Sequence, residues 1–220
     1  MDALMPQPRR RIAPGAVHVP GWLSIERQAE LVRVCRGWAS GPAGMRHTRL
    51  PSGGVMSVAT VCLGWHWSPY EYRRTTADGA AVKPFPSWLA DLGRQAVADA
   101  GPAEFELPDS TDYRPDIALV NFYAEEARMG QHRDADERSD APVVSLSLGA
   151  ACVFRFGNTE TRNRPWTDVR LESGDLFVFG GPSRLAYHGV PRTFEGTGPG
   201  DLIGLTTGRL NVTLRQSGLD

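Results

Sequence analysis

A short run near the C-terminus, RLNVTLR at residues 209–215, gives the strongest indication of how this chain folds. Polar and apolar residues alternate strictly along it, which is the pattern of a β-strand with one face on an apolar core. Arg209 and Arg215 both fall on the polar face. That face either meets water or lines a polar interior. A polar interior requires anionic partners for both guanidinium groups, because a buried unpaired charge is very unfavourable.

Similar short β-rich runs precede this strand, and turn-forming Gly, Pro, Asp and Asn residues separate them. The runs are IALVNFY at 117–123, VVSLSL at 143–148, CVFRF at 152–156 and DLFVF at 175–179. Many short strands that follow two helices indicate an α+β fold. In such a fold we expect an antiparallel double-sheet barrel with the helices packed on its outside.

Two segments of the N-terminal half predict the helices. Apolar residues recur at the spacing of one helical face over 24–37 and again over 87–101, and Ser24 is a suitable N-cap for the first helix. The segment between them, about 45–86, is aromatic and turn-rich, so we expect hairpins or a flap there. Residues 1–15 are rich in Pro and Arg and are expected to form an extended lead-in.

The composition is that of an ordinary globular domain. The chain has 220 residues, of which 41% are hydrophobic and 22% charged, enough for one core with a small elaboration. A net charge of −1 argues against a protein that coats nucleic acid through bulk charge, although a local basic surface remains compatible. No apolar run is long enough for a membrane span. Three cysteines without metal-binding or disulfide spacing predict a protein of the reducing cytoplasm.

A candidate metal site lies in the segment GQHRDADE at 130–137. His132 and Asp134 are two residues apart and therefore point the same way on an extended backbone. His188, beyond the DLFVF strand, offers a third ligand. Two histidines and one carboxylate leave three coordination positions of an octahedral metal ion open. This arrangement suits iron(II) that must bind a cosubstrate and O₂. A zinc hydrolase can use the same ligands, and a solvated polar turn is the alternative without a metal.

The two arginines of the C-terminal run favour a metal centre that binds an anionic cosubstrate over a solvated polar turn. Arg209 and Arg215 are about 20 Å apart along an extended strand. Two long side chains that lean together, with a short dicarboxylate between them, can close that gap, and arginine is well shaped to bind a carboxylate through two hydrogen bonds. Asn121 and Tyr123 share a strand face and add an amide and a phenol donor for the same ligand.

In their order along the chain, these motifs resemble the AlkB family of nucleic-acid dealkylases. The motifs are NFY, H-x-D, SLSLG, FRFG, SGDLFVFGGPSRLAYHG and RLNVTLRQSG. The resemblance implies a double-stranded β-helix, or jelly-roll, core over about 117–218. It also implies flanking N-terminal helices and a nucleotide-recognition flap at about 45–86, all within a single domain of residues 1–220. The segment 191–208 looks longer than is usual in the family, and its path is not predicted.

The resemblance also assigns the cofactor sites. The iron(II) ligands of the family are matched by His132, Asp134 and His188. The arginines that hold 2-oxoglutarate are matched by Arg209 and Arg215. Side chains that form hydrogen bonds with 2-oxoglutarate are matched by Asn121, Tyr123 and Asn211.

On the substrate side, a dealkylase must take a base out of the stack or bind single strands. By resemblance, Trp65 matches the residue that stacks on the base opposite His132, Tyr72 a residue of the flap, and Asp136 an acid near the exocyclic amine of the base. Arg162 lies in a loop that can hold a phosphate or the rim of the base. The alternatives are a tryptophan packed beneath a loop, a solvated acid and an arginine that is only exposed.

We therefore expect an iron(II)- and 2-oxoglutarate-dependent dioxygenase that repairs N-alkylated bases of DNA or RNA by direct reversal, with hydroxylation of the methyl group and release of formaldehyde. The expected partner is alkylated nucleic acid, single-stranded or with a flipped base, bound by a monomer away from membranes. One alternative keeps the cofactors but acts on a protein or a small molecule. Another is a module that binds modified nucleic acid without turnover.

Overall fold

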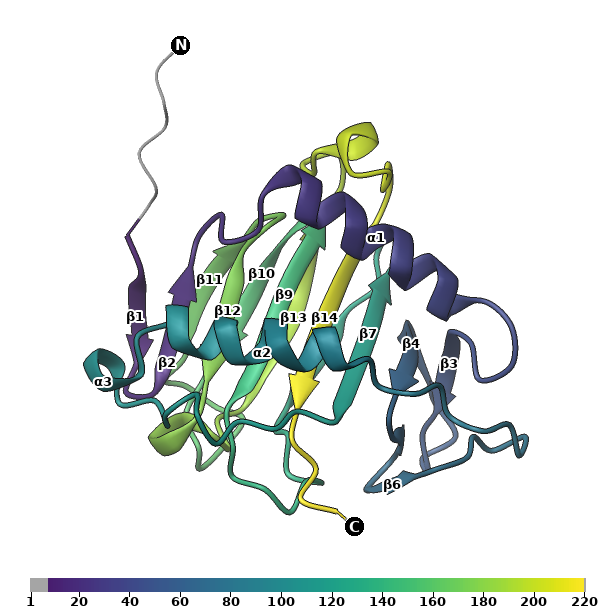
Figure 1. The fold of residues 1–220 in the computed structure, drawn as a ribbon, viewed down its shortest axis with the longest axis horizontal. Coiled ribbons are helices and arrows are strands. Elements are labelled where there is room, and N and C mark those ends of the chain that lie inside the picture. The colour runs from purple at the N-terminus through teal and green to yellow at the C-terminus, as the bar shows by residue number, and fades with distance from the viewer. Residues whose placement is uncertain (1–7, 220) are drawn as a thin grey trace.

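A computed structural model describes residues 8–219 and shows two facing antiparallel sheets with helices on the outside (Figure 1). The larger sheet has the strand order β1-β2-β12-β9-β14-β7-β4-β3. Its strands are β1 (Arg10–Ala13), β2 (Ala16–Val19), β3 (Arg46–Arg49), β4 (Val55–Leu63), β7 (Ile117–Tyr123), β9 (Val143–Gly149), β12 (Leu176–Phe179) and β14 (Arg209–Arg215).

The smaller sheet has the order β11-β10-β13-β8 and lies behind the larger one in the view of Figure 1. Its strands are β8 (Met129–His132), β10 (Ala151–Phe156), β11 (Thr167–Leu171) and β13 (His188–Phe194). A separate hairpin is formed by β5 (His66–Ser68) and β6 (Glu71–Arg73). Two facing antiparallel sheets with outer helices confirm the predicted α+β fold with a jelly-roll core.

Two helices, α1 (Ile25–Ala39) and α2 (Ser87–Asp99), cross the outer face of the larger sheet (Figure 1). The Ser24 hydroxyl caps α1 by accepting a hydrogen bond from the Arg27 backbone N–H at 3.3 Å, as the sequence predicted. A short helix, α3 (Pro102–Phe105), follows α2. No helix of the described residues is long and apolar enough to cross a lipid bilayer.

Strand β14 occupies the middle of the larger sheet, between β9 and β7, and is buried along its whole length. Its apolar residues Leu210, Val212 and Leu214 join the core beneath the two helices. Its polar residues face the space between the sheets, where Arg209 is 1% exposed and Arg215 7%. The polar face therefore lines the interior, and the alternative of a water-facing strand is wrong.

The aromatic segment before α2 is divided between the larger sheet and a hairpin. Strand β4 pairs with β7 and extends the sheet, and β3 pairs with β4 at the edge. Strands β5 and β6 pair only with each other, with Trp67 opposite Tyr72. This hairpin lies beside the end of β14 from which the C-terminus continues (Figure 1).

The segment 191–208, whose path the sequence did not predict, closes one end of the core. It continues β13, turns through a 3₁₀ helix (Gly200–Leu202) and leads into β14. Ile203 is buried in the helix-side core. The Arg36 guanidinium, in the last turn of α1, donates a hydrogen bond to the Gly204 carbonyl. These two contacts tie the segment to α1 and to the core beneath it.

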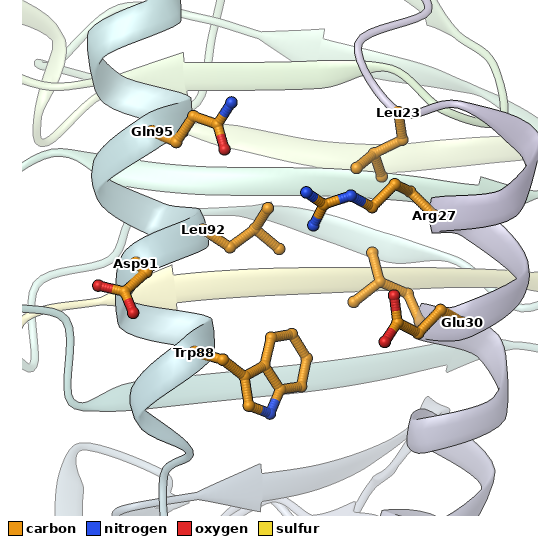
Figure 2. A pocket seen from close by; sticks show the side chains of 8 residues that line it. Leu23, Arg27, Glu30, Trp88, Asp91, Leu92 and Gln95 are labelled. Carbon is orange, nitrogen blue, oxygen red and sulfur yellow. The ribbon is translucent and has the colours of Figure 1, made fainter.

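A groove of about 310 Å³ runs between α1 and α2 (Figure 2). Leu23, Leu92 and Trp88 form apolar parts of its lining, and Arg27 and Asp91 contribute charge. The helices cover the outer face of the larger sheet, so the groove lies on the opposite side of that sheet from the smaller one.

The packing of α2 predicts a large loss of stability when its inner face is truncated. Leu89 is fully buried, so Leu89→Ala should lower the free energy of unfolding by about 2–5 kcal/mol. Gln95 is on the exposed face of the same helix, and Gln95→Ala should change this free energy by less than about 0.5 kcal/mol. Urea denaturation measures both. Similar small losses in the two variants would show that α2 does not anchor the core.

Candidate active site

A cavity of about 710 Å³ opens between the two sheets. The larger sheet contributes the polar face of β14 and residues of β7, and the smaller sheet contributes residues of β8 and β13. Trp67, Tyr70 and Arg162 also line it, as do the candidate metal ligands. The volume lies within the range of small-molecule sites in proteins.

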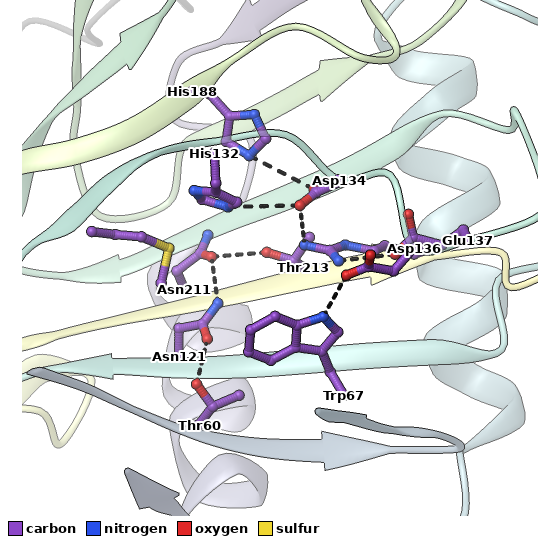
Figure 3. Close-up of polar contacts among 12 residues, drawn as sticks. Thr60, Trp67, Asn121, His132, Asp134, Asp136, Glu137, His188, Asn211 and Thr213 are labelled. Carbon is purple, nitrogen blue, oxygen red and sulfur yellow. Dashed lines mark hydrogen bonds and ion pairs between the residues drawn. The ribbon is translucent and has the colours of Figure 1, made fainter. Parts of the chain in front are cut away.

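The three candidate metal ligands lie together in this cavity (Figure 3). His132 ends β8 and His188 begins β13, and these two residues are direct partners in the ladder. Asp134 follows two residues after His132. The donor atoms of all three lie within 4.8 Å of one another. Antiparallel pairing of two strands that are distant in sequence therefore supplies the third ligand.

Backbone hydrogen bonds set the tautomer of both histidines. His132 Nδ1 lies 3.0 Å from the Gly130 carbonyl oxygen, and His188 Nδ1 lies 3.0 Å from that of Ala186. A carbonyl oxygen only accepts, so each Nδ1 carries the proton. The lone pair is then on Nε2, which faces Asp134 in both cases. A carbonyl partner on the far nitrogen is the usual support of a metal-binding histidine.

The spacing of these atoms fits a shared metal ion better than direct hydrogen bonds. His132 Nε2 lies 3.6 Å from Asp134 Oδ1, and His188 Nε2 lies 3.7 Å from Asp134 Oδ2. Two ligands that are each about 2.1 Å from an ion lie roughly 3.0–3.6 Å apart. Asp134 Oδ2 is buried without a hydrogen-bond partner, which is unfavourable unless a cation or water meets it.

Charge and burial hold two of these ligands in their metal-binding forms. Burial opposes ionisation of Asp134 more strongly than any single neighbour favours it, but Arg215, the two histidines and Arg184 together outweigh burial and lower the pKa of this carboxyl to about 2. Burial lowers the pKa of His188 to about 4. At neutral pH the carboxyl is therefore ionised and this imidazole neutral, as metal binding requires.

Arg215 belongs to a buried cluster of two acids and two arginines. Its guanidinium lies 2.7 Å from Asp134 and 2.9 Å from Glu137. Arg184 lies 2.9 Å from the other oxygen of Glu137 and donates a hydrogen bond to the Asp134 carbonyl at 2.6 Å. Tyr72 donates a hydrogen bond to Glu137 as well. Glu137 and Arg184 were not predicted from the sequence, although Glu137 lies in GQHRDADE and Arg184 in SGDLFVFGGPSRLAYHG.

Arg209, at the other end of β14, has no acidic partner among residues 8–219. Its guanidinium donates to the Ser147 hydroxyl at 2.9 Å and to the Ala150 carbonyl at 3.4 Å, and its Nε is buried without a partner. No carboxylate of the described residues forms an ion pair with it within 4.0 Å. A buried guanidinium in this state requires an anionic ligand in the cavity.

Asparagine and tyrosine side chains surround the same part of the cavity. Asn121 and Asn211 are paired across β7 and β14, and the Asn121 amide donates a hydrogen bond to Asn211 Oδ1 at 3.4 Å. The Tyr123 hydroxyl has only a weak partner, the Met129 sulfur at 3.7 Å. All three predicted partners of 2-oxoglutarate line the cavity with Arg209. The Asn211 amide already donates to the Ser145 hydroxyl at 2.8 Å and to the Leu146 carbonyl at 3.2 Å, so a ligand oxygen would meet chiefly the Tyr123 hydroxyl and the second amide hydrogen of Asn121.

Trp65, predicted to stack on a base, lies outside the cavity lining. It is 7% exposed, and its indole N–H donates a hydrogen bond to Asp116 at 3.1 Å. The Arg74 guanidinium lies 3.5 Å from the centre of its ring. The chain turns at Gly64, whose φ of +77° is one that glycine adopts readily. Trp67, two residues later, lines the cavity instead.

The other predicted substrate residues lie around the cavity in different ways. Asp136 lines it and accepts a hydrogen bond from the Trp67 indole at 2.8 Å. Tyr72 points to Glu137 and Arg215, outside the lining. Arg162 is exposed at the cavity, with its guanidinium 5.8 Å from the Tyr187 ring. Their contacts with a substrate stay predictions.

Comparison with known proteins gives matches over nearly the whole chain. The profile of the 2OG-Fe(II) oxygenase superfamily matches residues 15–215. The alpha-ketoglutarate-dependent dioxygenase AlkB of Salmonella typhimurium is 37% identical, over 94% of this chain and 92% of its own length. The structure of OsALKBH1 superimposes with a TM-score of 0.82 at 33% identity, over 94% of this chain and 100% of that one.

A plant relative is longer. The DNA N(6)-methyladenine demethylase ALKBH1D of Arabidopsis thaliana is 33% identical over 93% of this chain, which spans 50% of the length of that protein. The motifs, the two-sheet fold and these matches agree. The chain belongs to the AlkB family of the 2OG-Fe(II) oxygenase superfamily.

Proposed function

We propose that this protein oxidatively demethylates N-alkylated bases of DNA or RNA, with iron(II), 2-oxoglutarate and O₂. One observation carries the proposal. The buried guanidinium of Arg209, which has no carboxylate partner among residues 8–219, lies in the same cavity as the ligand atoms of two histidines and an aspartate. The three ligand atoms need a cation, and the guanidinium needs an anion. A zinc hydrolase would bind the cation but has no anionic cosubstrate to pair with Arg209. Relatives whose names state demethylation of DNA or tRNA support the choice of substrate.

The residues present fit the two cofactors. Iron(II) would be held by His132, Asp134 and His188, with Asp134 Oδ2 as the carboxylate oxygen that Arg215 leaves free. One carboxylate of 2-oxoglutarate would pair with Arg209. Its remaining oxygens would accept hydrogen bonds chiefly from Asn121 and Tyr123, with Asn211 beside them, and Arg215 would lie at the metal end of the cavity.

When bound, iron(II) supplies the oxidation that converts 2-oxoglutarate and O₂ to succinate and CO₂ while the methyl group becomes a hydroxymethyl group. The hydroxymethyl group then leaves as formaldehyde, and the base nitrogen regains its proton. The chain keeps water from this reaction with apolar walls, which include Leu119, Phe154 and Val190. The polar groups of the cavity orient 2-oxoglutarate so that the end of the molecule nearest the metal ligands faces the methyl group of the base.

Nucleic acid is the partner that the cavity mouth favours. Arg128, Arg133 and Arg162 line the cavity and are exposed. None of them has a carboxylate within 4.0 Å among the described residues. Free guanidinium groups of this kind suit phosphate oxygens. They form a local basic surface, which the overall net charge of −1 does not exclude.

The position of the metal centre between two sheets also constrains the substrate. A base reaches it only outside a stacked duplex, so we propose that the substrate is single-stranded or presents a flipped base.

In this proposal residues 45–86 serve as the recognition flap over the catalytic core at 117–218. One chain suffices because it supplies every site residue. The cysteines Cys35, Cys62 and Cys152 are free and buried, which suits the cytoplasmic location that we propose.

The proposed reaction predicts formaldehyde release from methylated oligonucleotides. The protein is loaded with iron(II) and 2-oxoglutarate without O₂, then given air and a panel of N-methylated DNA and RNA oligonucleotides. We expect formaldehyde and succinate in equal amounts with at least one methylated oligonucleotide and none with its unmethylated counterpart. Succinate without formaldehyde across the panel would favour a protein or small-molecule substrate. Binding without succinate would favour a module that only recognises modified nucleic acid.

Removal of a metal ligand should abolish turnover without unfolding the protein. The His132 side chain is 36% exposed, so His132→Ala should leave the circular dichroism spectrum and melting temperature nearly unchanged. Iron(II) binding, followed by calorimetry without O₂, and succinate formation should both be lost. His47→Ala is the matched control for iron(II) binding, because His47 is exposed and lies on β3, outside the cavity lining. Succinate formation at the wild-type rate by His132→Ala would disprove the metal assignment.

Replacement of Arg209 should separate cosubstrate binding from stability. Loss of a charge-assisted contact to a carboxylate should raise the KM for 2-oxoglutarate by roughly 10- to 100-fold in Arg209→Gln. The cofactor-free protein should not become less stable, because the guanidinium has no acidic partner there. Arg170→Gln, which alters an exposed arginine paired with Glu172, should leave the KM unchanged. An unchanged KM in Arg209→Gln would exclude Arg209 from the cosubstrate site.

A further inference from the structure

The outer face of the smaller sheet, on the side away from the cavity, carries arginines and aromatic rings next to one another. Inward residues of its strands, such as Phe154 and Val169, are buried in the core, and the residues that alternate with them point outward. The outward residues of β10, β11 and β13 and their immediate neighbours include four arginines, two aromatic rings and two acids. They are Arg155, Arg164, Arg170, Arg192, Trp166, Phe194, Asp168 and Glu172.

A first unit of this face is built on Trp166, just before β11. The guanidinium carbons of Arg155 and Arg164 lie 4.5 and 5.2 Å from the centre of its ring. Arg155 also donates two hydrogen bonds of 2.8 Å to Asp168. These bonds lower the pKa of that carboxyl, and the charge of Arg164 adds a smaller effect. Arg164 itself is exposed and has no carboxylate within 4.0 Å among residues 8–219. One arginine of the unit is therefore paired, and the other is available to a ligand.

A second unit repeats this arrangement on Phe194, the last residue of β13. The guanidinium carbons of Arg170 and Arg192 each lie 4.8 Å from the centre of its ring. Arg170 pairs with Glu172 at 3.0 Å, whereas Arg192 is exposed and has no carboxylate within 4.0 Å in the described part of the chain. A guanidinium that rests on an aromatic ring is already oriented, so it loses less freedom when it binds an anion.

The two units are separated along the direction of β11. Trp166 of the first and Arg170 of the second are four residues apart, which is about 13 Å on an extended strand. This length corresponds to roughly four stacked nucleotides, at about 3.4 Å for each phosphate of one strand. Two oriented positive charges at such a separation suit a polymer with regularly spaced negative charges better than one small anion.

The turn between β10 and β11 joins the first unit to the mouth of the cavity. Arg162 in this turn lines the cavity, and Arg164, two residues later, contacts the aromatic ring of the outer face. The Asn158 side chain forms four hydrogen bonds with backbone groups of residues 160–165 and so holds the turn in one shape. A strand that leaves the cavity at Arg162 therefore reaches the outer face by crossing a single ordered turn.

We propose that the outer face of the smaller sheet binds the backbone of the same nucleic-acid strand whose target base enters the cavity, with Arg164 and Arg192 as contacts to phosphates away from that base. The inference rests on the proposed function and extends its substrate site beyond the cavity. Arginine binds phosphate oxygens through paired hydrogen bonds. Such contacts position a strand without reading its sequence, so this face adds affinity for long strands whatever their bases.

The dependence of binding on strand length tests this assignment. Fluorescence anisotropy without O₂, with protein that carries iron(II) and 2-oxoglutarate, gives the Kd of a methylated trinucleotide and of a long single strand with the same methylated base at its centre. The double variant Arg164→Gln/Arg192→Gln should raise the Kd of the long strand by roughly 2- to 30-fold, at about 1.4- to 5-fold for each exposed charge contact. The Kd of the trinucleotide, which is too short to reach the face, should stay at its wild-type value.

The salt dependence of long-strand binding gives a second readout. The slope of log K against log salt concentration should become shallower by about 1.4 in the double variant, at about 0.7 for each lost phosphate contact. Asp168→Asn should have the opposite effect, because it leaves Arg155 unpaired: the Kd should fall and the slope should steepen by about 0.7. The matched control, Arg27→Gln/Arg33→Gln, removes the same charge from exposed positions of α1 on the far side of the larger sheet and should change neither quantity.

These measurements separate the outer face from the proposed reaction. Weaker binding of a long unmethylated strand by the double variant supports the face even if the wild type releases no formaldehyde and the proposed reaction fails. Equal Kd values and equal slopes for the double variant and the wild type would overturn the inference while the reaction stands. An effect with a duplex but none with a single strand would also overturn it, since the face would then contact the opposite strand.

Discussion

The ion pair between Arg215 and Asp134 is the contact on which the rest of the site depends. Burial at this depth disfavours an ionised carboxylate, and the guanidinium 2.7 Å away is the largest of the contributions that keep Asp134 charged. The pair joins the last strand of the larger sheet to the chain just beyond β8 of the smaller sheet. Glu137 and Arg184 complete a cluster of two negative and two positive groups. Tyr72 connects the β5–β6 hairpin to the same cluster, so both sheets and the hairpin share one anchor.

The two ends of β14 differ in how their charges are neutralised. At one end, Arg215 is paired by acids of the protein itself. At the other, Arg209 has only hydroxyl and carbonyl partners, and its charge is left for a ligand. A single strand therefore both stabilises the candidate metal ligand Asp134 and presents a buried guanidinium suited to an anion. This asymmetry explains why the site suits a dicarboxylate beside a metal ion better than a neutral cosubstrate.

Much of the fold could be predicted because it follows from local patterns. Alternation along 209–215 predicted the buried polar face of β14, and helical spacing with a capping Ser24 predicted α1. The sequence could not show that Trp67 lines the cavity and Trp65 does not, because the acids that these two indoles contact, Asp136 and Asp116, come from segments distant in sequence. The cluster around Glu137 was also missed, because its partners come from segments that are distant in sequence.

The central position of β14 has a consequence for how the protein is made. This strand is the last of the described chain and is inserted between β9 and β7, which are synthesised well before it. Domains fold as units while the ribosome adds residues from the N-terminus onward. Until β14 emerges, Asp134 lacks its cation and the cavity lacks both arginines. A nascent chain that lacks β14 therefore has neither the ion pair at Asp134 nor a complete cavity, and both form only when the larger sheet closes around this strand.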